Sequence, residues 1–428
     1  MRRGGRFSYR LIAVTVLAIV IIFGVAVSVI VGGAARVSEP QSARGALHAG
    51  NTVPTSDPET VRTALAAALT FVPAPGATAV APDSPIVGKA GAGRLASVRV
   101  TSSSGLAVAG GLTAADEWRS SGSLAYGAVY HVTATVGDGA AVQAQSTATF
   151  ATLSPPASVT ASVFPSAGLQ VGVAQPVVFR FSRDITSDAA RSSLLMHLSV
   201  TESRPVIGGW HWFSARELHF RPQGFWPTGE RITVDWNLTG WTAGGGDWGA
   251  GAGTIPFTIG HARVSYANLT THLMTVTDNG RVVATYPISG GKAADPTMAG
   301  VHIVLDRESV VHMVSSTNGI PVNSPDGYDE LVYDDVHISD TGEYVHAAPW
   351  SVTSQGRSNV SHGCINLSPA NARTFFAFSR VGDVVIVTGS PRPPVVGDHG
   401  VMDWDTGWSA FTQGNVIVPP PAGLPSLY

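Results

Sequence analysis

Residues 345–350 read Val-His-Ala-Ala-Pro-Trp and residues 361–367 read Ser-His-Gly-Cys-Ile-Asn-Leu, and the fold must bring these two stretches together if they act jointly. Cys364 is the single cysteine of the chain. A cysteine acyltransferase needs a thiolate nucleophile and a base that takes the thiol proton. It also needs a group that orients the base and backbone N–H groups that face the oxyanion. The two stretches contain residues for each of these parts.

Two histidines are candidates for the base that serves Cys364. His362 is two residues away, and alternate side chains of an extended segment point to the same side. His346 precedes the cysteine by eighteen positions and would reach it through the fold. The residues alone leave both open. Gly363 lets a substrate approach the backbone closely, and the N–H groups of Gly363 and Cys364 are candidates for the oxyanion site.

Cys364 could also serve as a packing residue or as a metal ligand. A single cysteine is often a small buried hydrophobic residue with no chemical role. Cysteine and histidine are also zinc ligands, so Cys364, His346 and His362 could form a zinc site. The His-Gly-Cys spacing is unusual for zinc, however, and the chain has no second cysteine. We therefore expect neither a metal nor another cofactor.

The segment around these stretches, residues 260–390, has the pattern of a mostly β domain with one short helix. Asn279-Gly280 supplies the positive φ angles of a tight hairpin turn between two strands. Ser368-Pro369 predicts a helix start, with serine as N-cap and proline at the first helical position. The helix is expected to end near Arg380, before a buried strand at residues 383–387.

Two β-sandwiches are predicted before this domain, at residues 73–153 and 154–259. Short stretches that alternate apolar and polar residues, such as 130–136 and 231–236, are separated by Gly and Ser clusters, as in half-buried strands. Six tryptophans lie in the second segment. Core or interdomain packing explains them, and a glycan-binding face is the alternative. Their positions are Trp210, Trp212, Trp226, Trp236, Trp241 and Trp248.

Both ends of the chain have separate patterns. Residues 1–36 begin with four arginines followed by an uncharged apolar run, which is long enough to span a bilayer with the arginines inside. The alternative is a cleaved signal peptide, whose apolar region is usually shorter. Residues 37–72 read as a linker, although 59–71 could form a short helix. We expect the tail, residues 391–428, to pack on the domain before it or on the neighbouring sandwich.

The composition argues against a nucleic-acid partner. Charged residues make up 13% of the chain and the formal net charge is −3. A protein that neutralises a phosphate backbone needs a basic surface, which this sequence does not supply.

His346, the fourteen residues before Ser361, and residues 361–366 resemble the signature of the L,D-transpeptidase (YkuD-type) catalytic domain. Residues 319–328 are similar to the lid of the mycobacterial members. Tandem immunoglobulin-like domains before the catalytic domain and a tryptophan-bearing tail after it are similar to the same subgroup. The resemblance covers most of the chain beyond the N-terminal segment, and its specific part is the motif ending at Asn366.

The resemblance implies that Cys364 is the nucleophile and His346 its base. It implies that a cysteine thioester carries the acyl group between peptidoglycan stem peptides, from a tetrapeptide donor to a diamino-acid acceptor, which gives 3→3 cross-links. Carbapenem-type β-lactams are implied as covalent inhibitors, and a catalytic part in the periplasm or cell wall follows. Supporting and substrate-binding roles are implied for Tyr328, Ser361, His362, Gly363, Asn366, Trp350 and Ala347.

Two positions depart from the family pattern. Ala347 stands where the subgroup often has serine, which matters only if the serine hydroxyl, rather than the backbone carbonyl, orients His346. Asn318 stands where close relatives have a lid tyrosine. Two alternatives remain open, and the departures support the second of them. Water as acceptor would make the protein an L,D-carboxypeptidase, and a degenerate domain would make it a peptidoglycan-binding envelope module without catalysis.

Overall fold

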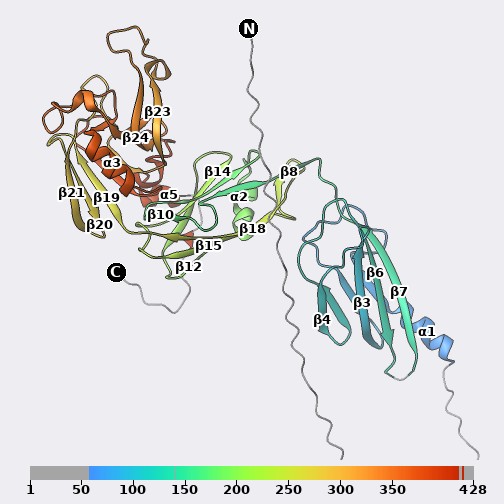
Figure 1. Cartoon of the computed structure of the whole chain (residues 1–428). Helices are drawn as coiled ribbons and strands as arrows, with labels where there is room; N and C mark the ends of the chain where they lie inside the picture. Colours follow the sequence, from blue (N-terminus) through green and yellow to red (C-terminus); the bar gives the residue numbers. More distant parts are fainter. Residues whose placement is uncertain (1–56, 140, 414–416, 419–428) are drawn as a thin grey trace, which may run out of the picture. The chain divides into compact units, whose positions relative to one another are not determined.

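The computed structural model describes residues 57–139, 141–413 and 417–418 (Figure 1). The predicted anchor at residues 1–36 and most of the predicted linker lie outside these residues. Among the helices that the structure describes, none is both long enough and apolar enough to cross a bilayer. The described chain is mostly β, as predicted, with immunoglobulin-like sheets followed by the predicted β-rich domain.

The first sandwich has one four-stranded and one three-stranded sheet, both antiparallel. In β6, inward residues alternate with exposed ones, so one face enters a core around Trp118, Tyr130 and Phe150. The four-stranded sheet has the order β1-β2-β5-β4 and the other the order β3-β6-β7. The bounds are β1 Leu69–Val72, β2 Val87–Ala90, β3 Arg94–Ser102, β4 Gly110–Ala114, β5 Glu117–Ser120, β6 Val129–Gly137 and β7 Gln143–Ala151.

The end of the predicted linker belongs to this sandwich, which corrects the boundary at residue 72. Helix α1 (Pro58–Ala67) begins at the N-cap Asp57 and leads directly into β1. Leu65, Leu69 and Phe71 are buried in the sandwich core. Their burial removes apolar surface from water, and a flexible linker would leave that surface exposed.

The second sandwich has sheets of order β10-β18-β15-β12 and β28-β13-β14-β11-β9, with a small sheet β16-β17-β8 beside them. Trp210, Trp226 and Trp241 are buried in its core, as packing predicts. The bounds are β8 Ala157–Val159, β9 Ala161–Phe164, β10 Gln170–Val171, β11 Val177–Phe181, α2 Asp188–Leu194, η1 Leu195–His197, β12 Leu198–Glu202, β13 Gly208–Trp212, β14 Glu217–Pro222, β15 Arg231–Asn237, β16 Thr242–Gly244, β17 Asp247–Gly249, β18 Ala252–Ile259 and β28 Ile417–Val418.

The third domain packs a sheet of order β21-β20-β19-β27-β22 and a sheet of order β23-β24-β25-β26 around one core. Helix α3 packs against β24, β25 and β26 in this domain. The bounds are β19 Arg263–Asn268, β20 Leu273–Asp278, β21 Arg281–Pro287, β22 Gly300–Ile303, β23 Asp306–Val314, η2 Ser315–Asn318, β24 Asp329–Ser339, β25 Glu343–Ala347, η3 Pro349–Ser351, β26 Ile365–Leu367, α3 Pro369–Phe378 and β27 Val384–Thr388.

Local sequence explains two elements of this domain. Asn279 and Gly280 both have positive φ and form the predicted turn between β20 and β21. The Ser368 side chain accepts a hydrogen bond from the Asn371 N–H, so the predicted N-cap of α3 is confirmed. The helix ends at Phe378, slightly before the expected position.

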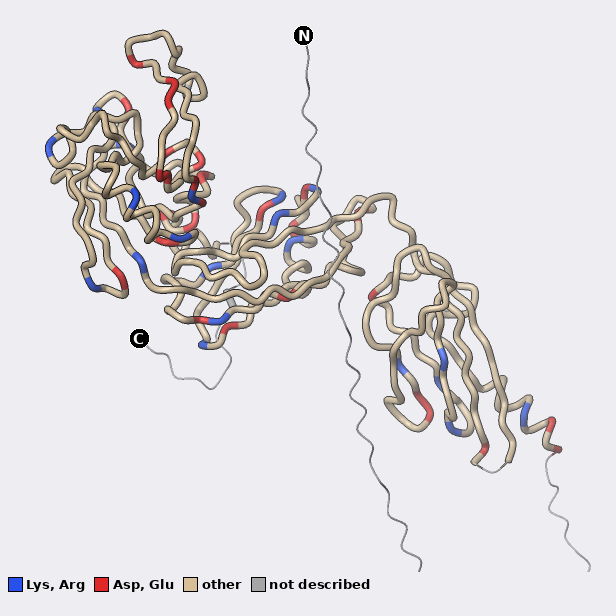
Figure 2. Tube along the Cα trace, in the orientation of Figure 1, with Lys and Arg blue, Asp and Glu red and all other residues tan. Residues whose placement is uncertain are grey.

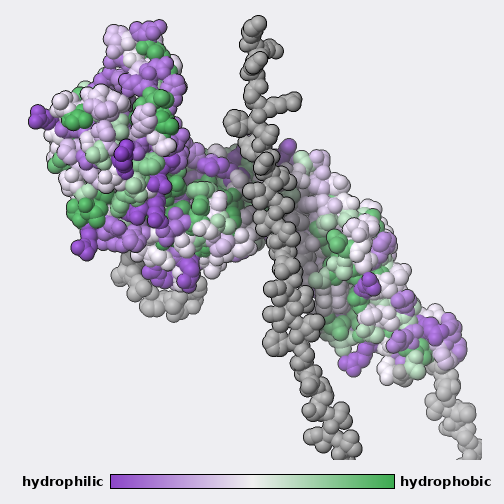
Figure 3. Space-filling view, in the orientation of Figure 1, coloured by the Kyte–Doolittle hydropathy of each residue, from purple (hydrophilic) through white to green (hydrophobic). Residues whose placement is uncertain are grey.

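The tail contacts both neighbouring domains. Helix α4 (Met402–Asp405) packs near β22 of the third domain, whereas α5 (Trp408–Thr412) packs on β13 of the second sandwich. Strand β28 extends the sheet of that sandwich by pairing with β13. Charged residues are sparse along the chain (Figure 2), and polar and apolar residues are mixed over the face shown in Figure 3.

Candidate active site

Strands β25 and β26 place the predicted residues side by side. The two strands are parallel neighbours, with His346 opposite Asn366. Cys364 directly precedes β26, so the nucleophile loop ends where the strand begins. Val345 and Ile365 point into the core and anchor both strands. His346 and Cys364 both line one cavity of about 380 Å3.

His346 is held by the backbone of the next residue. Its Nδ1 lies 3.1 Å from the carbonyl oxygen of Ala347. A carbonyl only accepts, so Nδ1 carries the proton and Nε2 is left as the basic nitrogen. A carbonyl can orient the histidine whatever side chain follows it. The alanine at position 347 therefore leaves this orienting bond in place.

The thiol and the imidazole are both held in their neutral forms. Burial raises the pKa of Cys364 to about 12, against an opposing backbone hydrogen bond from Tyr344. Burial also lowers the pKa of His346 to about 4. The Cys364 side chain is partly exposed to the cavity, with Sγ 3.8 Å from the Gly342 carbonyl oxygen. The free site thus holds a neutral thiol and a neutral base in one cavity.

Ser361 forms two hydrogen bonds within the nucleophile loop, residues 361–364. Its hydroxyl donates to the Cys364 carbonyl oxygen at 2.6 Å and accepts from the Gly363 N–H at 3.1 Å. The Gly363 N–H is therefore occupied, and the prediction that it faces the oxyanion is wrong. The Cys364 N–H remains the candidate donor for that role. Gly363 has a φ of +128°, a conformation that favours glycine.

Asn366 and Trp350 make different kinds of contact near the base. The Asn366 side-chain amide donates to the Ser351 hydroxyl at 3.0 Å, which fixes the segment after β25. The Trp350 ring lies 6.1 Å from the His346 ring, and Trp350 is 55% exposed. Asn366 therefore has a structural contact, whereas Trp350 offers an accessible aromatic wall beside the base.

His362 faces the lid. Its Nε2 lies 3.0 Å from Nζ of Lys292, and its ring lies 5.1 Å from the ring of Tyr328. An ammonium group only donates, so Nε2 of His362 accepts from it. Tyr328 lines the same cavity as Cys364, as the resemblance implied. The Asn318 side chain lies outside what the structure describes.

Three charged residues near the nucleophile were missed by the sequence analysis: Lys292, Glu343 and Asp335. Glu343 is 3% exposed and bonds the Met298 N–H at 2.9 Å and Arg392 at 2.6 Å. Asp335 is fully buried, and neither carboxyl oxygen has a hydrogen-bond partner among the described residues. Burial raises the pKa of each carboxyl to about 7. No local sequence signal marks these three residues, because their burial and partners depend on the fold.

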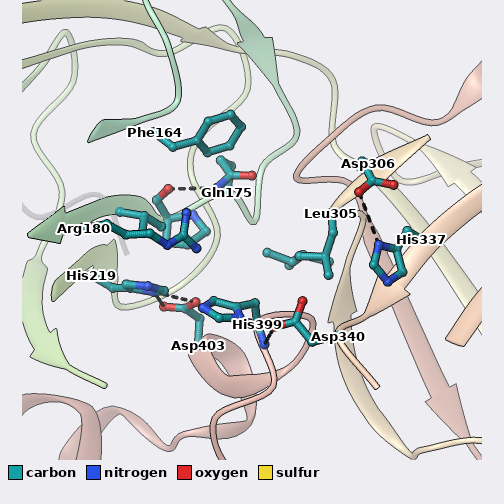
Figure 4. Close-up of a pocket in the computed structure, with 13 residues that line it drawn as sticks. Phe164, Gln175, Arg180, His219, Leu305, Asp306, His337, Asp340, His399 and Asp403 are labelled. Atoms are coloured by element: carbon teal, nitrogen blue, oxygen red, sulfur yellow. Dashed lines mark hydrogen bonds and ion pairs between the residues drawn. The ribbon is translucent and has the colours of Figure 1, made fainter. Parts of the chain in front are cut away.

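A second cavity of about 390 Å3 lies between the second sandwich and the third domain (Figure 4). Its lining includes Arg180, His219, His337, His399 and Asp403 and lacks the cysteine. The two cavities differ in their chemistry, because only the first contains a nucleophile with a base. Among the residues that the structure describes, no cluster of three or more His, Cys, Asp and Glu side chains is arranged to hold a metal.

Comparison with known proteins gives concordant matches. Residues 77–242 match the bacterial Ig domain, and residues 262–387 match the L,D-transpeptidase catalytic domain. The chain is 38% identical to L,D-transpeptidase 2 of Mycobacterium tuberculosis, over 79% of this chain and 83% of that protein. It is 33% identical to L,D-transpeptidase 5 of the same species, over 84% and 79%. A solved L,D-transpeptidase in complex with imipenem is 37% identical over 55% of this chain and 100% of that chain, with a TM-score of 0.48.

Proposed function

The chain belongs to the L,D-transpeptidase family, and from this premise we propose that it forms 3→3 cross-links in peptidoglycan through a thioester on Cys364. The observation that carries the proposal is one cavity that contains the single cysteine and a histidine whose Nδ1 is fixed by the Ala347 carbonyl. Nε2 of that histidine is the base that a cysteine acyltransferase requires.

The first half-reaction is acylation. Sγ of Cys364 attacks the carbonyl carbon of the third residue of the donor stem while His346 Nε2 takes the thiol proton. The Cys364 N–H stabilises the oxyanion. The tetrahedral intermediate then breaks its C–N bond, and the imidazolium gives its proton to the departing amine. The terminal D-residue leaves with a free amine, and Cys364 holds the acyl group as a thioester.

The second half-reaction regenerates the thiol. The side-chain amine of a diamino acid on a second stem attacks the thioester carbonyl, and His346 Nε2 accepts the amine proton. Collapse of the intermediate breaks the C–S bond, and the imidazolium returns the proton to sulfur. Because the free pair is neutral, proton transfer accompanies each attack rather than preceding it.

Carbapenem acylation follows from the same chemistry. Cys364 Sγ attacks the strained β-lactam carbonyl while His346 Nε2 takes the thiol proton. The lactam C–N bond then opens, the imidazolium gives that proton to the lactam nitrogen, and the opened ring stays on Cys364 as a thioester. The relative solved with imipenem is consistent with this assignment.

We place the catalytic part outside the membrane, held by the N-terminal segment. The support is the arginine-led apolar run of residues 1–36. Fractionation of cells that produce the full chain tests this, and recovery in the soluble cytosolic fraction would contradict it.

The proposed activity is tested with residues 37–428 and a disaccharide-tetrapeptide, read by mass spectrometry. We expect a cross-linked dimer that has lost one terminal D-alanine and an acyl adduct on Cys364. Cys364→Ala should form neither. Tripeptide without dimer would assign hydrolysis, and the absence of both adduct and product from the folded protein would refute the enzyme.

A further inference from the structure

Lys292 lies at the edge of the active site with an unusual set of partners. Its Nζ is 2.6 Å from Oδ1 of Asp326, 3.3 Å from Asp295 and 3.0 Å from Nε2 of His362. The three acceptors match the three hydrogens of an ammonium group. Hydrogen bonding to Asp326, followed by Asp295, raises the pKa of Lys292, so it is positively charged at neutral pH.

The backbone fixes Lys292 to the nucleophile loop. The Lys292 N–H donates to the Ser361 carbonyl oxygen at 2.9 Å, and the Ser361 N–H donates to the Gly290 carbonyl oxygen at 3.0 Å. The ammonium group is therefore presented from the same rigid loop pair that carries Cys364. Its side chain is 26% exposed, which leaves it accessible at the rim.

The carboxylates that contact Lys292 differ in origin. Asp295 follows Lys292 by three residues and belongs to the same loop. Asp326 belongs to the lid between β23 and β24, lines the cavity with Cys364, and is 66% exposed. An exposed ion pair contributes little net stability. Another carboxylate can therefore replace Asp326 at small cost, while Asp295 remains.

We propose that Lys292 binds the carboxylate of the D-residue that leaves the donor stem, and that Asp326 occupies this cation until the stem enters. The inference rests on the proposed function and names the feature that selects its donor. In such a stem the terminal carboxylate lies one residue beyond the attacked carbonyl, and consecutive Cα atoms are about 3.8 Å apart. The cation that binds it must therefore lie beside the nucleophile loop, and the backbone bond from the Lys292 N–H to the Ser361 carbonyl oxygen holds Lys292 there.

Replacement of Asp326 by the substrate carboxylate at Lys292 also links binding of the donor stem to the lid. When the substrate carboxylate replaces Asp326, residues 326–328 lose their ion pair with the base of the site. Tyr328, which contacts the His362 ring, lies in the same part of the lid. After acylation the D-residue departs with its carboxylate, and Asp326 returns to Lys292.

The inference is tested by equilibrium binding of two tetrapeptide stems to the Cys364→Ala protein, one ending in D-alanine and one in D-alanine amide. We expect the acid to bind about tenfold more tightly than the amide, which corresponds to about 1.4 kcal/mol. Adding Lys292→Met should remove this preference by weakening the acid alone, whereas Lys292→Arg should retain it. Asp326→Asn should strengthen acid binding several-fold, because the competing carboxylate is gone.

Lys89→Met is the matched control, since Lys89 is the only other lysine of the chain and lies 54% exposed in the first sandwich. It should change neither affinity. Equal binding of acid and amide, or a preference that survives Lys292→Met, would overturn the inference while leaving the proposed function intact. Binding of neither stem would overturn both.

Discussion

The resting charge of Cys364 follows from what surrounds its sulfur. Burial is the main cause of its raised pKa, and the carboxylates of Glu343 and Asp335 add to it. Burial keeps His346 neutral. A thiolate and an imidazolium would each have to be charged in a poorly solvated site, which is costly. The neutral pair is therefore the resting state.

Alkylation of the free enzyme tests this state. With a thiol pKa of about 12, the rate of Cys364 alkylation by iodoacetamide should be low at pH 7 and rise about tenfold per pH unit to pH 10. His346→Ala should show nearly the same profile, because the base is neutral at rest. A plateau between pH 6 and 8 in the unmodified protein would instead reveal a preformed thiolate–imidazolium pair.

Glu343 contributes to the raised pKa of Cys364. Its Oε1 lies 3.4 Å from the position that a Cβ on Gly363 would occupy, so the carboxyl lies directly against the nucleophile loop. Glu343→Gln keeps an oxygen acceptor for the Met298 N–H and for Arg392 but removes the negative charge. We expect the alkylation rate of Cys364 at pH 8.5 to rise several-fold. Glu308→Gln, at an exposed position on β23, is the control. An unchanged rate in Glu343→Gln would show that the carboxyl is already protonated at this pH.

The sequence singled out Cys364, His346 and His362 from a pattern of residues 346–366, and the structure brings all three to one cavity. The sequence did not identify Lys292 or Glu343, since their roles depend on contacts across many residues: Lys292 with Asp326, and Glu343 with Arg392. It also misassigned the Gly363 N–H, because the Ser361 hydroxyl that occupies it depends on the local loop conformation. The motif residues are close in sequence, whereas the residues that set their charge and hydrogen bonds are far from them in sequence.

Among the elements, those with a local signal were predicted and those fixed by packing were not. The Asn279-Gly280 turn and the Ser368 cap appear where their sequences indicate. The short helix that residues 59–71 could form is present as α1, but strand β1 and the packing of both elements were not predicted, because nothing nearby shows that Leu65 and Phe71 enter the sandwich core. The tail was expected on the preceding domain or on the neighbouring sandwich, and only the fold shows how α5 and β28 reach β13.

Strand β14 explains how the tail is attached. Leu218 and Phe220 point into the sandwich core, and the opposite face of the strand is covered by the tail. Arg221 on that covered face is 2% exposed and stacks on the rings of Trp404, Trp408 and Phe411 at 4.2–5.2 Å. It also donates to the Thr406 carbonyl oxygen at 2.9 Å.

Removing this side chain should release the tail. We expect Arg221→Ala to lower the free energy of unfolding by about 2–4 kcal/mol, because buried cation–π contacts and a hydrogen bond are lost together. Hydrogen exchange across residues 402–412 should accelerate. Arg216→Ala is the matched control, since its exposed ion pair with Asp184 should contribute under about 1 kcal/mol. Unchanged exchange in Arg221→Ala would show that the helices hold without it.

At the scale of the whole molecule, a chain of imidazoles and carboxylates joins the second sandwich to the third domain. Figure 4 shows two of its contacts, His219 with Asp403 and His399 with Asp340. Glu217 Oε1 on β14 lies 2.7 Å from Nε2 of both His219 and His399. His219 also contacts Asp403 of the tail at 2.9 Å, and His399 contacts Asp340 after β24. The apolar core continues across the same junction, where Ile303 and Val384 join the sandwich cluster. The junction is therefore both packed and charged.

This network makes the stability of the junction depend on pH. Hydrogen bonding to Glu217 raises the pKa of His399 to about 9, and the pKa of His219 is raised in the same direction because its contacts with Asp403 and Glu217 outweigh burial. An unfolded histidine titrates near about 6.5. The stabilisation is therefore complete below this pH and is lost as the pH rises through about 9. Glu217 has a lowered pKa, so its contribution to stability has the opposite pH dependence and is lost only in acid.

His399→Gln tests the dependence. We expect the protonated His399 to contribute about 1–2 kcal/mol to the free energy of unfolding. This is less than its raised pKa alone implies, because a third of the side chain is exposed to solvent. Urea unfolding at pH 6 and pH 9 should show the natural chain losing more stability than His399→Gln between the two pH values. His312→Gln, in an exposed pair with Asp329, should retain the natural slope. Equal slopes in all three proteins would mean that His399 is neutral in the folded chain, and the junction would then depend on its apolar contacts alone.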